Sequence, residues 1–234
     1  MKKVIITGGG GFIGRHVLSC LSPDEWEIHV VTMQPSKKAG CKGEWHAIDL
    51  FDTKKTNELV HAISPTHLLH LAWCHGGNKF WMSEENLSWL AASLSLLRSF
   101  AEAGGSRVVM AGTCAEYQWG SERLSEQKVP LKPSTLYGMT KHALQEVMQS
   151  YSKAVGISAA WGRVFSPYGP FQDETRFIPS LSNSMLRNEA ALCSYGSLVR
   201  DFIYVEDVAL AFVKLLESGM EGPINIGTGK GRSL

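Results

Sequence analysis

The stretch KVIITGGGGFIG, residues 3–14, decides the fold expected for this chain. Its first five residues are mostly apolar and β-branched, which is typical of a short buried strand. The glycines that follow allow a tight turn, let the backbone approach a pyrophosphate closely, and let a helix pack against the strand. The segment FIGRHVLSCL predicts that helix, whose amino terminus offers N–H groups and a positive dipole to phosphate. A glycine loop between a first strand and a first helix therefore predicts a dinucleotide-binding site.

The rest of the chain alternates strand and helix patterns in the same way. Further strands are predicted at 27–32, 44–50, 66–72, 106–113 and 157–165, and helices at 53–63, 83–103 and 137–155. Strands that alternate with helices indicate an α/β fold, a doubly wound parallel sheet covered on both faces. The pattern loosens at residue 166. Residues 1–165 are therefore predicted as the dinucleotide-binding domain, and 166–234 as a smaller substrate-binding lobe whose segment 201–218 returns to the main domain.

Composition and charge limit the classes of protein that remain open. The chain has 234 residues, of which 44% are hydrophobic and 19% charged, as in a soluble globular protein. Its formal net charge of +1 gives no global field that would attract nucleic acid or a membrane. No stretch approaches the roughly 18 apolar residues of a membrane span, and the apolar run before the glycines is too short for a signal peptide. These features predict a cytoplasmic protein that binds neither nucleic acid nor membrane.

The cysteines and histidines lack the spacings that are typical of metal sites. The five cysteines are scattered and show no CxxC pair, which indicates reduced thiols rather than disulfides or a zinc site. The eight histidines form no HxxxH or HExxH pair. The sequence therefore predicts no metal site.

The end of the second strand bears on which dinucleotide binds. A carboxylate at this point would bind the adenosine ribose diol of NAD, but Thr32 stands there, followed by Met33 and Gln34. The missing carboxylate removes repulsion against a 2′-phosphate, and the lysines at 37–38 would attract one. Arg15, just past the last glycine, is either a further phosphate contact or a solvated helix residue. The pattern favours NADP(H), with NAD(H) as the alternative.

The segment STLYGMTKHALQEV, residues 134–147, places Tyr137 one helical turn before Lys141. On the predicted helix Tyr137 lies in line with Leu144 on the apolar arc, and Lys141 lies at its margin. A buried tyrosine and a snorkelling lysine would explain this spacing by packing alone. The chemical interpretation is that the ammonium, with an oxidised nicotinamide nearby, lowers the pKa of the phenol, as general acid–base catalysis requires.

Together these motifs resemble the extended short-chain dehydrogenases/reductases and, more narrowly, the nucleotide-sugar epimerase/dehydratase family. TGGGGFIG (7–14) is similar to that family's TGxxGxxG, YGMTK (137–141) to its YxxxK, and RDFIYVEDVA (200–209) to its RDFxxVxDVA. AGTCAEY (111–117) stands where the family carries its catalytic Ser/Thr, and INIGTG (224–229) is similar to the strand that follows. The resemblance covers nearly the whole chain. It implies a Rossmann-type fold, an NAD(P) cofactor and a nucleotide-sugar substrate.

The resemblance also implies roles for particular residues. Thr113, Tyr137 and Lys141 are the implied catalytic residues: Thr113 shields charge on the substrate oxygen, Tyr137 transfers the proton, and Lys141 also binds the nicotinamide ribose. The implied cofactor contacts are Gly8, Gly11, Phe12, Ile13, Gly14, Thr32, Asp49, Leu50, Leu71, Ala72, Tyr137 and Lys141. The implied substrate contacts are Thr113, Ser166 and Arg200, the last on the diphosphate.

The residues after Thr113 reduce the number of family reactions that this chain is expected to catalyse. Dehydratases of the family carry an acidic pair where this chain has Cys114 and Ala115, which argues against 4,6-dehydration. Enzymes that epimerise at C3 and C5 carry a cysteine where Ala115 stands, which argues against that route too. Two reactions remain: reduction of an NDP-4-keto-6-deoxyhexose, favoured because reductases use NADPH, and 4-epimerisation with tightly bound NAD. A non-catalytic NADP-binding protein is an alternative from another class, but such proteins usually lack the Tyr or the Lys.

Three further expectations concern the surroundings of the site. Glu116, His75 and Trp73 line up near it, and Trp73 and Phe165 either shape a sugar pocket or only pack. Family members continue beyond INIGTG, so the substrate lobe is predicted to be incomplete. In relatives the helices at 83–103 and 137–155 form a dimer interface. The first carries an apolar stripe, which predicts either a homodimer or a core face; its members are Leu87, Leu90, Leu94 and Leu97.

Overall fold

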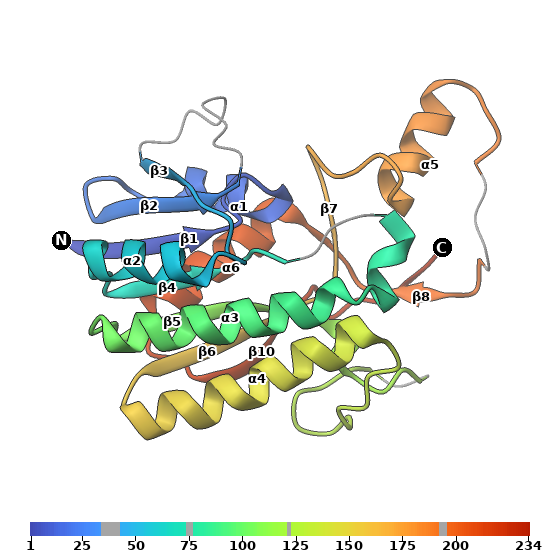
Figure 1. Ribbon diagram of the computed structural model, residues 1–234. Coiled ribbons are helices and arrows are strands. Elements are labelled where there is room, and N and C mark those ends of the chain that lie inside the picture. Colours follow the sequence, from blue (N-terminus) through green and yellow to red (C-terminus); the bar gives the residue numbers. More distant parts are fainter. Residues whose placement is uncertain (34–42, 74–76, 121–122, 192–195) are drawn as a thin grey trace.

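The protein is built around one seven-stranded sheet, seen in a computed structural model that describes residues 1–33, 43–73, 77–120, 123–191 and 196–234 (Figure 1). The strands of this sheet are β1 (Lys2–Thr7), β2 (Trp26–Thr32), β3 (Glu44–Ala47), β4 (His67–His70), β5 (Arg107–Thr113), β6 (Ser158–Val164) and β10 (Gly222–Ile226). The α-helices are α1 (Phe12–Cys20), α2 (Thr53–Ile63), α3 (Glu85–Glu102), α4 (Leu136–Val155), α5 (Phe177–Leu186) and α6 (Val205–Glu217). The short elements are the 3₁₀ helices η2 (Gly77–Met82) and η3 (Cys114–Glu116) and the strands β7 (Ser166–Tyr168), β8 (Val199–Arg200), β9 (Phe202–Tyr204) and β11 (Arg232–Ser233).

The order of the strands places a switch point at the centre of the sheet. The order is β10-β6-β5-β4-β1-β2-β3, and all neighbouring strands are parallel. The doubly wound Rossmann-type fold predicted from the sequence is thus confirmed. The chain builds outward from β1 in one direction and from β4 in the other, so the carboxyl ends of these two strands meet. Thr7 and His70 are paired there. In such sheets ligands bind at this point.

Helices cover both faces of the sheet (Figure 1). One core lies under α1 and α6 and includes Val4, Ile6 and Phe212. The other lies under α2, α3 and α4 and includes Ile5 and Met148. Because successive strand residues point to opposite faces, β1 needs an unbroken apolar run to fill both cores.

The strand predicted at 44–50 is shorter in the structure and ends at Ala47. Two aspartates begin the turn into α2. Asp49 Oδ1 accepts the N–H of Phe51 at 3.0 Å, and Asp52 Oδ1 accepts the N–H of Lys55 at 3.1 Å as the N-cap of the helix. These bonds shape the turn into α2. The ladder itself ends at Ala47 because Ala47 is paired with Thr32, the last residue of β2.

The last part of the chain divides between a small lobe and the main sheet. Strands β7 and β9 pair in parallel, β8 and β11 pair antiparallel, and α5 stands away from the sheet (Figure 1). Helix α6 packs on α1, and β10 adds to the sheet beside β6. This lobe has a pocket of about 570 Å³ that is open to solvent. The pocket is lined by Tyr168, Ile178, Phe202, Thr228, Lys230 and Arg232.

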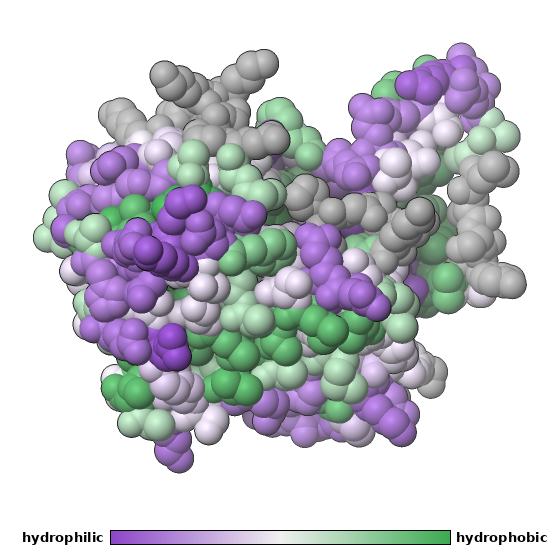
Figure 2. Space-filling view, in the orientation of Figure 1, coloured by the Kyte–Doolittle hydropathy of each residue, from purple (hydrophilic) through white to green (hydrophobic). Residues whose placement is uncertain are grey.

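Apolar side chains gather on the surface along α3 and α4 (Figure 2). Leu87 is 53% exposed and Val147 46% exposed, whereas Leu97 is buried. The stripe predicted on α3 is therefore divided between the core and the surface. Among the described residues, no helix joins the length and the apolar character that crossing a bilayer requires.

Candidate active site

The glycine loop lies between the carboxyl ends of β1 and β4. Gly8 has a φ of +71°, and a Cβ there would lie 2.7 Å from the backbone nitrogen of Ala72. A Cβ on Gly14 would lie 2.2 Å from the Gly8 carbonyl oxygen, which also accepts a 2.9 Å hydrogen bond from the Gly11 N–H. No side chain fits at Gly8 or Gly14, so this turn requires glycine.

The amino terminus of α1 makes the loop suitable for an anion. Gly11 is the N-cap, and within the described ranges no side chain caps the first turn, residues 12–14, which also lacks an acidic residue. Arg15 follows, and its guanidinium donates to the carbonyl oxygens of Gly10 at 3.0 Å and Gly11 at 3.2 Å. Uncapped N–H groups, the positive helix end and a nearby arginine fit the diphosphate of a dinucleotide.

The residues predicted to contact adenosine border the same loop. Thr32 is the last residue of β2, and its hydroxyl lies beside the loop. Its carbonyl oxygen accepts the Ile48 N–H at 3.1 Å, which places Asp49 and Leu50 next to the end of β2. Asp49 is exposed and Leu50 is buried. Residues 34–38, which include the lysines that favour NADP(H), lie outside the described residues.

Leu71 and Ala72 follow β4 and bond to the end of β1. The Leu71 N–H donates to the Thr7 carbonyl oxygen at 3.2 Å, and the Ala72 N–H donates to the Thr7 hydroxyl at 3.3 Å. The same hydroxyl lies 2.7 Å from His70 Nδ1. These bonds hold Ala72 against Gly8, so the segment predicted to pass beside the cofactor borders the glycine loop.

Thr113 and Tyr137 come from two elements that meet beyond this loop. Thr113 ends β5 and is 8% exposed. Tyr137 lies in the first turn of α4, where the Thr135 hydroxyl caps the helix by accepting the Gly138 N–H at 3.1 Å. The Thr113 side chain lies close enough to the Tyr137 hydroxyl to lower its pKa. The Tyr137 ring also meets the ring of Phe80 edge-on, with 4.9 Å between their centroids. Two hydroxyl groups thus share one point, where they could bind one substrate oxygen.

Lys141 is buried one turn further along α4. Only 3% of it is exposed. Its Nζ donates to the Ala111 carbonyl oxygen at 2.9 Å and lies 3.7 Å from the centroid of the Trp73 ring. Burial lowers the pKa of Lys141 to about 7, although the charge of Glu116 acts in the opposite direction. The sequence left open whether Trp73 shapes a sugar pocket or only packs. In the structure its ring packs on Lys141.

The surroundings of Tyr137 shift its pKa. Burial raises it above its usual range, and the charge of Glu116 raises it further. The Thr113 side chain and the charge of Arg176 lower it, but by less. The chain's own groups therefore favour the neutral phenol. Lys141 directs its ammonium to the Ala111 carbonyl oxygen. The expected lowering of the Tyr137 pKa also depends on an oxidised nicotinamide and stays a prediction.

Glu116 has a structural partner that the sequence did not predict. Its carboxylate is fully buried and accepts the Arg163 Nε–H at 2.7 Å, the Trp161 Nε1–H at 2.9 Å and the Thr113 backbone N–H at 2.8 Å. The ion pair with Arg163 fixes the backbone at Thr113. Arginine in a buried strand is the signal that could have revealed it, because a buried charge needs a partner. His75, also expected near the site, lies outside the described residues.

The two predicted substrate contacts lie at the start of the small lobe. Ser166 begins β7 and is half-buried, and its N–H donates to the Asp201 carbonyl oxygen at 3.0 Å. Arg200 ends β8; its guanidinium donates to the Val199 carbonyl oxygen at 2.9 Å. Its charge also acts on Cys114, which follows Thr113. Arg200 therefore lies on the side of the molecule that carries Thr113. Cys114 and Cys20 are free thiols, as expected, and residues 41, 74 and 193 are not described.

Known proteins similar to this chain include an epimerase, a dehydratase and a solved epimerase structure. A putative UDP-glucose 4-epimerase of Methanocaldococcus jannaschii is 27% identical, with the similarity covering 99% of this chain and 78% of that protein. The dTDP-D-glucose 4,6-dehydratase of Mus musculus is 26% identical, covering 97% and 68%. The crystal structure of Thermus thermophilus UDP-glucose 4-epimerase, a complex with NAD, has a TM-score of 0.86 and 25% identity, covering 99% of this chain and 79% of that one.

The family is shown by a match over almost the whole chain. The sequence model of the NAD dependent epimerase/dehydratase family matches residues 4–227, a range that contains the glycine loop, Thr113, Tyr137, Lys141 and Arg200. The resemblance drawn from the motifs is confirmed. The chain belongs to the NAD-dependent epimerase/dehydratase family.

Proposed function

We propose that this chain is an NAD(P)-dependent enzyme that acts on a nucleotide-activated sugar, and that its reaction is reduction of an NDP-4-keto-6-deoxyhexose at C4. The observation that carries the proposal is the meeting of the Thr113 and Tyr137 hydroxyls one helical turn from a buried Lys141. The glycine loop, which fits a dinucleotide, follows the carboxyl end of β1, and Thr113 ends the parallel strand β5, so both lie at the same end of the sheet.

The cofactor would lie along the switch point. The loop and the first turn of α1 would hold its diphosphate, Thr32, Asp49 and Leu50 would border its adenosine, and Lys141 would hold its nicotinamide ribose. When bound, NAD(P) supplies or accepts the hydride. The neutral Thr32 at the end of β2 supports NADP(H), whereas the family description and the NAD complex of the Thermus relative support NAD(H).

The residues of the chain handle the proton. In the reduction, Tyr137 donates its phenolic proton to the sugar C4 oxygen, while the Thr113 hydroxyl donates a hydrogen bond to the same oxygen as negative charge develops. The raised pKa of Tyr137 keeps the phenol protonated at neutral pH, which suits a proton donor. Arg200 would bind the diphosphate of the sugar nucleotide, and Ser166 the sugar.

The residues after Thr113 support hydride transfer at C4 without dehydration. Burial raises the pKa of the Cys114 thiol to about 12, so it does not exchange a proton readily at neutral pH. Ala115 is buried and carries no ionisable group. Removal of water from C5 and C6 needs an acid and a base at these positions, and neither is present.

A 4-epimerase that retains NAD is the second candidate. The two relatives named as UDP-glucose 4-epimerases favour it, and it uses the same Thr113 and Tyr137 contacts to the C4 oxygen. Reduction consumes one equivalent of reduced cofactor for each sugar, whereas epimerisation consumes none. Cofactor stoichiometry therefore separates the two reactions, and a non-catalytic NADP-binding protein would give neither product.

The test is an activity assay with two substrates. Purified protein is incubated with NADPH and a dTDP-4-keto-6-deoxyhexose, and separately with NAD and UDP-glucose, and the sugar nucleotides are separated by chromatography. We expect NADPH-dependent reduction that Tyr137→Phe lowers by about 10²–10⁴-fold. Tyr151→Phe, on the same helix but in the groove with α3, should retain activity. Product from UDP-glucose without net cofactor consumption would replace reduction by epimerisation, and full activity of Tyr137→Phe would contradict the catalytic assignment.

The cofactor preference has its own measurement. Thermal unfolding is followed with NADP, with NAD and without nucleotide, because a ligand stabilises the fold that binds it. We expect a larger rise in Tm with NADP. A larger rise with NAD would reverse the preference. A homodimer through α3 and α4, a cytoplasmic location and the division of the chain after residue 165 remain predictions.

A further inference from the structure

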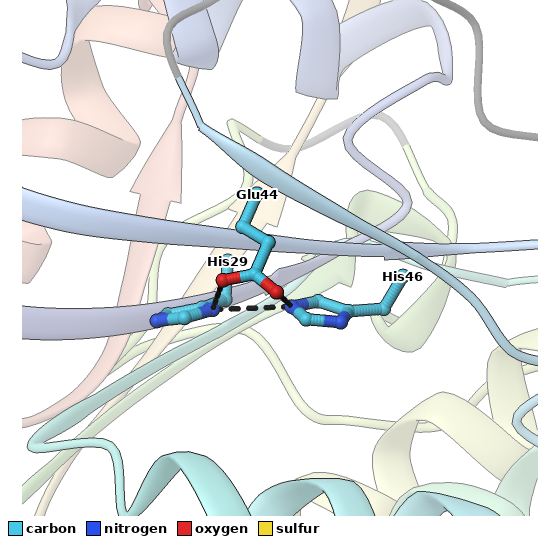
Figure 3. Close-up of side chains that lie close together, drawn as sticks. All are labelled: His29, Glu44 and His46. Carbon is cyan, nitrogen blue, oxygen red and sulfur yellow. Dashed lines mark hydrogen bonds and ion pairs between the residues drawn. The ribbon is translucent and has the colours of Figure 1, made fainter.

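Strands β2 and β3 each carry a glutamate and a histidine two residues apart: Glu27 and His29 on β2, Glu44 and His46 on β3. The strands are parallel, with His29 opposite Glu44. Since alternate residues of a strand share a face, all four side chains lie on one face of the sheet edge. Figure 3 shows the two histidine rings directed toward each other with the Glu44 carboxylate beside them.

The nitrogen and oxygen atoms of this cluster lie nearly as far apart as the ligand atoms of one metal ion. His29 Nδ1 and His46 Nε2 are 3.1 Å apart. The Glu44 carboxylate oxygens lie 3.6 Å from His29 Nδ1 and 4.0 Å from His46 Nε2. A tetrahedral Zn²⁺ ion with Zn–N bonds of about 2.0–2.1 Å holds two ring nitrogens about 3.3 Å apart. Small rotations of the two rings and of the exposed glutamate would bring all three groups to one ion.

The other nitrogen of His29 already has the partner that metal-binding histidines have. His29 Nε2 lies 3.0 Å from Glu27 Oε1. Glu27 Oε1 also lies 3.4 Å from Lys3 Nζ. A carboxylate oxygen accepts hydrogen bonds, so Glu27 accepts the Nε2–H of His29. The Nδ1 lone pair of His29 then faces His46 and Glu44. A carboxylate that orients a histidine in this way is the usual outer support of a metal ligand.

The cluster is both held and accessible. The His29 side chain is 8% exposed and that of His46 15%, so neighbouring residues restrict both rings. Glu44 is 68% exposed, so an ion can enter from solvent.

We propose that His29, His46 and Glu44 bind a divalent transition metal ion such as Zn²⁺, with water completing the coordination. The ligand set of two imidazoles and one carboxylate suits Zn²⁺, Cu²⁺ or Ni²⁺ and does not suit Mg²⁺ or Ca²⁺, which prefer oxygen ligands. The ion would join the edge strand β3 to β2 and so stabilise the strand that leads to Asp49 and Leu50. It would take no part in hydride transfer.

The prediction of no metal site rested on spacings within single segments, such as CxxC, HxxxH and HExxH. The ligands here are 15 and 17 residues apart in the chain (29 to 44 and 29 to 46) and come together only through the register of two parallel strands. The repeated pattern of glutamate, apolar residue and histidine in neighbouring strands, EIH at 27–29 and EWH at 44–46, is the signal that could have found it.

Titration calorimetry of tag-free, chelator-treated protein with ZnCl₂ tests the proposal, and the visible spectrum of the Co²⁺ form reports its geometry. We expect one Zn²⁺ per chain, a rise in Tm with Zn²⁺ but not with Mg²⁺, and a tetrahedral Co²⁺ spectrum. His46→Gln and Glu44→Gln should each weaken Zn²⁺ binding at least tenfold, and Glu27→Gln by about 10–100-fold through the lost support of His29. His61→Gln, an exposed histidine on α2, is the matched control and should bind as the unaltered chain does.

Two results would overturn the site. One is the absence of saturable Zn²⁺ binding at submillimolar concentration. The other is equal Zn²⁺ affinity in the unaltered chain, His46→Gln and Glu44→Gln, which would place the ion elsewhere. Circular dichroism of each variant verifies folding, and Glu44→Gln keeps the test decisive because its side chain is largely in solvent.

Discussion

At the scale of single residues, Lys141 shows how strongly burial changes the pKa of an ammonium group. Its Nζ donates to the Ala111 carbonyl oxygen and lies over two aromatic rings, those of Trp73 at 3.7 Å and Trp161 at 5.9 Å from the ring centroids. These partners replace only part of the hydration that an ammonium has in water. The pKa of Lys141 is therefore about 7 in the folded chain, compared with 10.5 for an unperturbed lysine.

This shift predicts a pH dependence of stability. Between pH 7 and 10.5 the unfolded chain holds a proton on Lys141 that the folded chain has released, so the stability of the fold rises with pH. Relative to Lys141→Met, which cannot titrate, the free energy of unfolding should increase from pH 7 to 9 by at most about 1.4 kcal/mol per pH unit. Urea unfolding at pH 7, 8 and 9 measures it.

An exposed lysine on the same helix provides the control for Lys141→Met. Lys153 lies in the last turn of α4 and is in solvent, so Lys153→Met should leave the pH profile parallel to that of the unaltered chain. Parallel profiles for Lys141→Met and the unaltered chain would show that Lys141 keeps its proton in the fold, and the low pKa would be wrong.

The spacing of Tyr137 and Lys141 could be read from the sequence, but the direction of their pKa values could not. The helical period places the two on neighbouring turns. The pKa values depend on Trp73, Ala111 and Glu116, which come from other elements and reach the pair only in the folded chain. A local pattern contains no information about such long-range partners.

At the scale of elements, the buried pair of Glu116 and Arg163 joins η3 to β6. Both side chains are fully buried, with 2.7 Å between Arg163 Nε and Glu116 Oε2. The Arg163 guanidinium also donates to Gln145 Oε1 on α4 at 3.1 Å. One charge network thus connects the elements that carry Thr113 and Tyr137.

Removing one charge from this network should destabilise the fold strongly. Glu116→Gln leaves the Arg163 guanidinium buried without its counter-ion, which costs about 3–5 kcal/mol. Glu102→Gln is the matched control, because Glu102 pairs with Arg98 at 3.7 Å on the exposed side of α3, and such surface pairs contribute about 0–1 kcal/mol. Urea unfolding of both variants at neutral pH should separate them. Equal losses would mean that burial adds nothing to the pair.

The arrangement of elements was more predictable than the side chains between them. Period-two and period-3.6 patterns predicted β1 to β6 and the helices α1 to α4, including α2 at 53–63, but they did not predict α5 or the short strands β7, β8 and β11. They overextended β3, because its end is set by its neighbour: Ala47 is paired with Thr32, the last residue of β2. The Glu116–Arg163 pair joins a 3₁₀ helix to a strand, and the His29–His46 cluster arises from the register of two strands. No single segment encodes either contact.

At the scale of the whole molecule, the two sides of the sheet present different surfaces. On the α3 and α4 side, apolar side chains gather on the surface (Figure 2). A groove of about 370 Å³ there is lined by Leu94, Ser95, Leu97, Arg98, Val147 and Tyr151. Exposed Leu87 and Met139 lie on the same two helices. The opposite side is covered by α1 and α6, where Leu210 is also exposed.

If α3 and α4 form a homodimer, a charge at the centre of this surface should dissociate it. Sedimentation velocity at micromolar concentration should show a dimer for the unaltered chain and a monomer for Val147→Glu, because an unpaired carboxylate in an apolar interface costs several kcal/mol. Leu210→Glu, equally exposed at 48% against 46% for Val147, lies on α6 and should remain dimeric. A monomer for the unaltered chain would end the dimer hypothesis, and dissociation by Leu210→Glu instead would move the interface to the α1 and α6 side.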